Sequence, residues 1–149
     1  EKKIIDNSSI RYGILNYVAK YSLASNSYFV TSKCFEHLNN LGLMKKGKLL
    51  RGSKGSKNRF TFEHPIPSNV IADEVIKNIG DKNKIMNILR ETDLVTVITY
   101  EENDMINRSG YVKKMPINSL TQKDMFARYK LSGVEVPTRR IKVYGAIAR

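Results

Sequence analysis

Two adjacent residues that could do chemistry, Glu63 and His64, stand at the end of a short hydrophobic run. A neutral imidazole can accept a proton from water near neutral pH, and a carboxylate can hold a proton or a metal ion. The run itself, residues 60–62, is aromatic and β-branched and therefore predicts a strand. Two prolines follow and end regular structure. The alternative is structural: His64 would bond to a backbone carbonyl, and Glu63 would pair with Arg59 or a nearby lysine.

The most basic part of the chain lies directly before this strand. Residues 44–59 contain seven basic residues, three glycines and no acidic residue. Glycine and serine favour a loop or hairpin tip that can lie against phosphates. We therefore expect this segment to bind a nucleic-acid backbone without reading its sequence, and the alternative is a solvated loop. The seven basic residues are Lys45, Lys46, Lys48, Arg51, Lys54, Lys57 and Arg59.

Composition favours the same kind of partner. The 149 residues include 26 Lys and Arg against 14 Asp and Glu, a net charge of +12. Such an excess favours a polyanion, most commonly nucleic acid. The single cysteine, Cys34, cannot form an internal disulfide, which fits a reducing compartment such as the cytoplasm. It shares a predicted helix with His37, but no second pair accompanies them, so we expect a packed thiol and a surface imidazole. No apolar run approaches the roughly 20 residues of a membrane span.

Hydrophobic periodicity predicts one compact α+β domain, residues 1–149, with short strands and several flanking helices. Residues 1–59 form a helical half with the basic segment, and residues 60–149 an α+β half that holds the candidate catalytic residues. The helix at 68–79 is expected to pack over the strands at 60–62 and 94–99. The other predicted helices and strands are helices at 8–21, 32–41, 85–89, 100–107 and 121–129, and strands at 28–30 and 139–144, the last as a basic edge strand.

Three segments occur in an order that resembles the HNH, or His-Me finger, nucleases. They are Glu63-His64-Pro65-Ile66-Pro67, the strand opened by Asp93-Leu94, and the helix that contains Glu102 to Asn107. The resemblance covers about residues 60–107. In that family the histidine of the first strand deprotonates the attacking water, and neighbouring side chains hold one divalent metal ion against the scissile phosphate.

The resemblance implies a ββα-metal centre with His64 as general base. It implies that Glu63, Asn103 and Asn107 bind the metal, and that Asp93 stands where the family has an orienting asparagine. Asn103 and Asn107 replace the commoner histidines, and oxygen ligands suit Mg²⁺ or Mn²⁺ better than zinc. The implied function is a metal-dependent endonuclease, with DNA favoured over RNA.

Two other functions need fewer of these residues. One is a non-catalytic nucleic-acid-binding or inhibitor protein, of a kind that phages encode. It would use the basic segment and an N-terminal half whose helix and hairpin resemble a winged helix. The other is a basic module that binds an acidic protein, for which the charge alone is sufficient.

Overall fold

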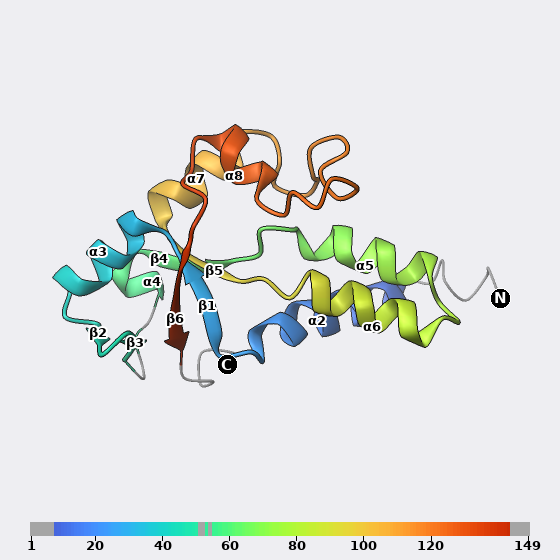
Figure 1. Ribbon diagram of the computed structural model, residues 1–149, viewed down its shortest axis with the longest axis horizontal. Helices are drawn as coiled ribbons and strands as arrows, with labels where there is room; N and C mark the ends of the chain where they lie inside the picture. Colours follow the sequence, from blue (N-terminus) through green and yellow to red (C-terminus); the bar gives the residue numbers. More distant parts are fainter. Residues whose placement is uncertain (1–7, 51–52, 54, 144–149) are drawn as a thin grey trace.

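The computed structural model describes residues 8–50, 53 and 55–143. It has helices and a mixed sheet, which confirms the predicted α+β class (Figure 1). The helices are α2 (Ser8–Leu23), α3 (Ser32–Asn40), α4 (Gly55–Asn58), α5 (Ser68–Lys77), α6 (Lys82–Glu91), α7 (Tyr100–Arg108) and α8 (Ala127–Ser132). The strands are β1 (Ser27–Val30), β2 (Met44–Lys45), β3 (Lys48–Leu49), β4 (Phe60–Glu63), β5 (Thr96–Thr99) and β6 (Arg139–Val143). The helix expected at 121–129 is shorter, because most of that segment forms turns and α8 begins only at Ala127.

The six strands form one sheet in the order β2-β3-β6-β1-β5-β4. The pairs β1–β5 and β3–β6 are parallel, and the other neighbours are antiparallel. The antiparallel pairing of β4 with β5 confirms that the two strands of the predicted centre lie side by side. The C-terminal strand, however, is not the predicted edge strand. The short hairpin β2–β3 pairs with β6 on one side and β1 pairs with it on the other, so β6 is interior.

Alternate residues along each strand point to opposite faces of the sheet. One face, which we call the α3 face, packs against the apolar side of α3 and forms the main core. The other, the α8 face, packs against α7 and α8 in a smaller cluster of Ile98, Ile106, Tyr129 and Val134. The buried residues of the main core are Tyr28, Val30, Cys34, Leu38, Leu49, Phe60, Val95, Val97, Ile141 and Val143.

Helices α2, α5 and α6 form a separate apolar cluster beside the sheet (Figure 1). Ile71 and Val75 of α5 are buried against Val18 of α2 and Leu89 of α6. Helix α5 therefore packs on other helices and not over β4 and β5, which corrects the expectation for residues 68–79. In the part of the chain that is described, no helix has the length and apolar character needed to cross a membrane.

The basic segment contains ordered structure as well as turns. Lys46 and Gly47 have positive φ angles of 48° and 70°, as a tight two-residue hairpin turn requires, and this turn joins β2 to β3. Helix α4 follows and packs against β4, where a Cβ on Gly55 would clash with the Phe60 carbonyl oxygen. The hairpin joins the sheet through the parallel pairing of β3 with β6.

Helix α7 begins where the sequence predicts, with Thr99 as its cap. The Thr99 hydroxyl accepts a hydrogen bond from the Glu102 N–H, and the Glu102 carboxylate accepts one from the Thr99 N–H at 2.9 Å. The same carboxylate accepts a hydrogen bond from Thr31, the cap of α3, at 2.9 Å. Glu102 thus joins the starts of α3 and α7, and it fixes which side of α7 faces the protein.

Candidate functional site

Glu63 ends β4 in a buried ion pair. Its Oε1 accepts a hydrogen bond from Arg128 at 2.9 Å, and its Oε2 accepts one from the Tyr129 hydroxyl at 2.6 Å. The exposed fraction is 3% for the Arg128 side chain and 12% for that of Glu63. The structural alternative for Glu63 was an ion pair with Arg59 or a nearby lysine. That expectation is wrong, because Glu63 pairs with Arg128 and Arg59 pairs with Glu101.

Arg128 also holds the chain just after β4. Its Nη1 donates to the carbonyl oxygens of His64 and Pro65 at 2.9 and 3.2 Å. Burial raises the pKa of Glu63, and the charge of Arg128 and the hydrogen bonds from Tyr129 and Arg128 lower it in part. Burial and the Glu63 charge raise the pKa of Tyr129 well above its usual range. Both oxygens of Glu63 are therefore already bonded, and a metal ion there would have to displace Arg128 or Tyr129.

His64 is held in its neutral form. Burial lowers its pKa below the ordinary value of 6.5, a hydrogen bond with the Leu94 backbone raises it in part, and the charge of Arg128 lowers it. Its Nδ1 atom is buried and has no hydrogen-bond partner. Asp93, on the segment before β5, likewise has a buried Oδ1 without a partner. A neutral imidazole with an unbonded nitrogen has the protonation state that a general base needs.

The two asparagines belong to α7, a helix that starts at the other end of β5. Glu63 pairs with Thr96 at the start of β5, whereas α7 follows Thr99 at the other end, about 10 Å along the strand. Helix α7 turns Glu102 and Ile106 into the protein, so Asn103 and Asn107, the next residues, lie about 100° further round the helix. Asn103 is half-buried and Asn107 is exposed.

The ββα-metal centre that the resemblance implies stays a prediction. The order strand, strand, helix is present, but within the described residues no hydrogen bond or ion pair links either asparagine of α7 to Glu63 or His64. The described part of the chain also contains no cluster of three or more His, Cys, Asp or Glu side chains that could hold a metal ion.

Basic side chains gather on the same α8 face, but over the strands β2, β3 and β6 at the opposite edge of the sheet from β4. The register pairs Lys45 of β2 with Lys48 of β3, and Lys48 with Lys142 of β6. Directly paired residues point to the same face, so these three lysines form a row across three strands. Arg140, two residues before Lys142, lies on the same face. We call Lys45, Lys48, Arg140 and Lys142 the basic sheet face.

This face remains charged and open. Lys45, Arg140 and Lys142 are exposed and Lys48 is half-buried. Helices α7 and α8 cover the face over β4 and β5, where Ile98 packs against Tyr129. No ion pair among the described residues involves Lys45 or Lys142.

The remaining predicted phosphate contacts lie elsewhere. Lys46 is at the exposed hairpin turn and Lys57 is exposed on α4. Arg59 forms a 3.0 Å ion pair with Glu101, which offsets its charge. Arg51 and Lys54 lie outside the described residues. The prediction from the sequence missed Arg140 and Lys142, although the polar–apolar alternation of residues 139–143 was a usable signal.

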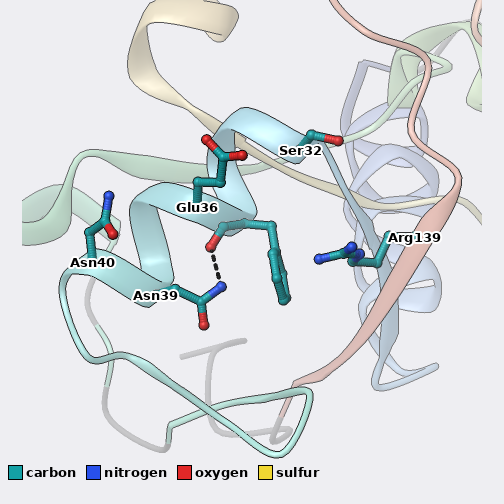
Figure 2. A pocket seen from close by; sticks show the side chains of 6 residues that line it. Ser32, Glu36, Asn39, Asn40 and Arg139 are labelled. Carbon is teal, nitrogen blue, oxygen red and sulfur yellow. Dashed lines mark hydrogen bonds between the residues drawn. The ribbon is translucent and has the colours of Figure 1, made fainter.

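Arg139 and Arg140 each stack on a phenylalanine, on opposite faces of the sheet. The Arg140 guanidinium lies 4.0 Å from the centre of the Phe29 ring, and Arg139 lies 4.0 Å from that of Phe35. Figure 2 shows Arg139 pointing toward α3 beside an open hollow of about 380 Å³. The hollow is lined by Ser32, Phe35, Glu36, Asn39, Asn40 and Arg139.

No protein-family model, curated protein or solved structure matches this chain.

Proposed function

We propose that the protein binds nucleic acid through the basic sheet face. The observation that carries the proposal is the row of Lys45, Lys48 and Lys142, which the strand register sets side by side. Strands lie about 4.8 Å apart, so the row extends over about 10 Å. Phosphates of a nucleic acid would neutralise these like charges and release their counterions.

The chemistry of the row predicts how the binding behaves. Ammonium groups contact phosphates as point charges and do not read base edges. Binding is therefore expected to depend steeply on salt and weakly on sequence. The net charge of +12 adds long-range attraction for any polyanion. The three lysines of the row place part of that positive charge on the α8 face.

The test compares two double variants with the same loss of charge. Lys45→Gln with Lys142→Gln removes the two exposed lysines of the row, and Lys82→Gln with Lys84→Gln removes two exposed lysines of α6 as the control. Fluorescence anisotropy with a labelled oligonucleotide, repeated over a series of NaCl concentrations, gives the affinity and its salt slope. The row variant is expected to lower the slope by about 1.4 to 1.8, because each lost phosphate contact removes roughly 0.7 to 0.9.

Two results would contradict the proposal. One is an unchanged slope in the row variant, and the other is an equal change in both variants. Competition with poly-glutamate tests the acidic-protein alternative, because a module for acidic proteins would be displaced by that polymer as readily as by unlabelled oligonucleotide.

An HNH-type endonuclease that uses Mg²⁺ or Mn²⁺, with DNA favoured over RNA, stays a second proposal. It is supported by His64, which is neutral and has an unbonded Nδ1 at the end of β4. Of the predicted metal ligands, Glu63 is already bonded to Arg128 and Tyr129. We therefore place binding first, and binding requires none of these residues.

A further inference from the structure

We propose that the basic sheet face holds an unpaired nucleobase on the guanidinium of Arg140, so that the protein prefers single-stranded nucleic acid to duplex. This inference rests on the proposed binding function and names its ligand more closely. It depends on three features of Arg140: how its guanidinium is supported, what lies next to it, and which nucleic acids can use it.

The guanidinium of Arg140 stacks on one aromatic ring, which is itself packed against a second ring. It lies 4.0 Å from the centre of the Phe29 ring, and Phe29 packs edge-to-face against Phe126 of the segment before α8, with ring centres 5.5 Å apart. Arg140 Nη1 also donates a hydrogen bond to the Ser27 carbonyl oxygen at 3.3 Å. These contacts hold the planar group against the sheet, while the side chain as a whole remains exposed to solvent.

A guanidinium held in this way can stack on a base. Its plane is delocalised and weakly hydrated, and bases stack on arginine as they do on aromatic rings. Every base has a π face, so this contact tolerates any sequence. Lysine cannot replace it, because an ammonium group has the same charge but no plane.

Arg140 is also placed beside the predicted phosphate contacts. It precedes Lys142 by two residues on β6, a separation of about 7 Å on the same face. A strand whose phosphates lie along the row of Lys45, Lys48 and Lys142 can therefore turn one base toward Arg140. In a duplex the bases are paired and stacked inside the helix, so this contact is lost and only the phosphate contacts remain.

The experiment exchanges each of the two stacked arginines for lysine. Arg140→Lys keeps the charge and removes the stacking plane. Arg139→Lys is the matched control, because Arg139 stacks at the same 4.0 Å on Phe35 but on the α3 face. Each variant and the wild type are titrated with a fluorescein-labelled 12-nucleotide strand, with the same strand annealed to its complement, and with a strand of abasic sites. Circular dichroism spectra and thermal melts check that the variants are folded.

Arg140→Lys is expected to weaken binding of the single strand by about 5- to 150-fold, since stacking one base contributes roughly that factor. Binding of the duplex and of the abasic strand is expected to change less than twofold, and the salt slope is expected to stay the same because the charge is retained. Arg139→Lys is expected to match the wild type with every ligand.

Each other outcome has a distinct meaning. If Arg140→Lys binds the single strand as the wild type does, no base stacks on Arg140. The same conclusion follows if the variant loses as much affinity for the duplex as for the single strand. If Arg139→Lys alone loses affinity for the single strand, the base lies at the hollow in Figure 2 and the inference is wrong. These results leave the proposed function intact, whereas a wild type that binds none of the three ligands refutes the function itself.

Discussion

Replacing Arg128 by methionine should destabilise the protein more than any exposed basic substitution. Methionine has a similar length but cannot donate the three hydrogen bonds that Arg128 Nη1 makes to Glu63, His64 and Pro65. The Glu63 carboxylate would remain buried, bonded to Tyr129 alone. Breaking a buried ion pair from one side costs about 3–5 kcal/mol, because the other charge is left without its partner.

That loss of unfolding free energy corresponds to a measurable decrease in the melting temperature, Tm. The entropy of unfolding is about 2.1 cal/mol/K per residue, or about 0.3 kcal/mol/K for 149 residues. Arg128→Met is therefore expected to lower the Tm by about 10 to 15 °C in a circular-dichroism melt at pH 7. Arg90→Met, at an exposed arginine of α6, is the control and should change the Tm by no more than a few degrees.

A double variant separates the lost charge pair from lost packing. Adding Glu63→Gln to Arg128→Met removes the unpaired carboxylate. The double variant should recover part of the decrease in Tm, because burying an amide costs less free energy than burying a charge. An Arg128→Met protein that melts within about 2 °C of the wild type would refute the reasoning. It would show that Arg128 is not buried against Glu63 and would leave Glu63 free to bind a metal ion.

The remaining predictions concern His64. Its pKa in the folded protein is below the ordinary 6.5, so the unfolded chain binds more protons between the two values and stability is lost as the pH falls below 6.5. His64→Gln should reduce the fall in Tm between pH 7.5 and 5. If His64 is a general base, His64→Ala should abolish cleavage of plasmid DNA or structured RNA with Mg²⁺ or Mn²⁺, while nucleic-acid affinity is unchanged. Cleavage by this variant at the wild-type rate would exclude that role.

Local features of the fold could be predicted from local sequence. The β-branched run that forms β5 has a strand propensity that no neighbouring residue opposes, and all four of its residues are buried. Thr99 and Glu102 form a capping box, which depends only on residues three positions apart. The hairpin at residues 44–49 follows from a glycine in a short polar turn.

Contacts between distant residues could not be predicted in the same way. Arg128 and Glu63 are 65 positions apart, and nothing near Arg128 indicates that its helix turns it inward. The apolar residues of α5 show that one side is buried but not which element covers it, and that element proved to be α2 rather than the sheet. The placement of the candidate metal ligands could not be predicted for the same reason. Spacing shows that Asn103 and Asn107 share a side of α7, but the Glu102 contact to Thr31 decides where that side points.

The lysine row has a structural explanation that must be weighed against its proposed role. Lysines on an exposed edge strand prevent a sheet from pairing with other chains, and β2 is an edge strand. That explanation is sufficient for Lys45. It does not account for Lys142, because β6 is interior and paired on both sides. Like charges directly opposite one another are destabilising in a sheet, and the register sets Lys48 opposite both Lys45 and Lys142. A row that weakens the sheet beyond what edge protection requires is expected where a polyanion neutralises it, which is why the paired loss of Lys45 and Lys142 is the decisive test of function.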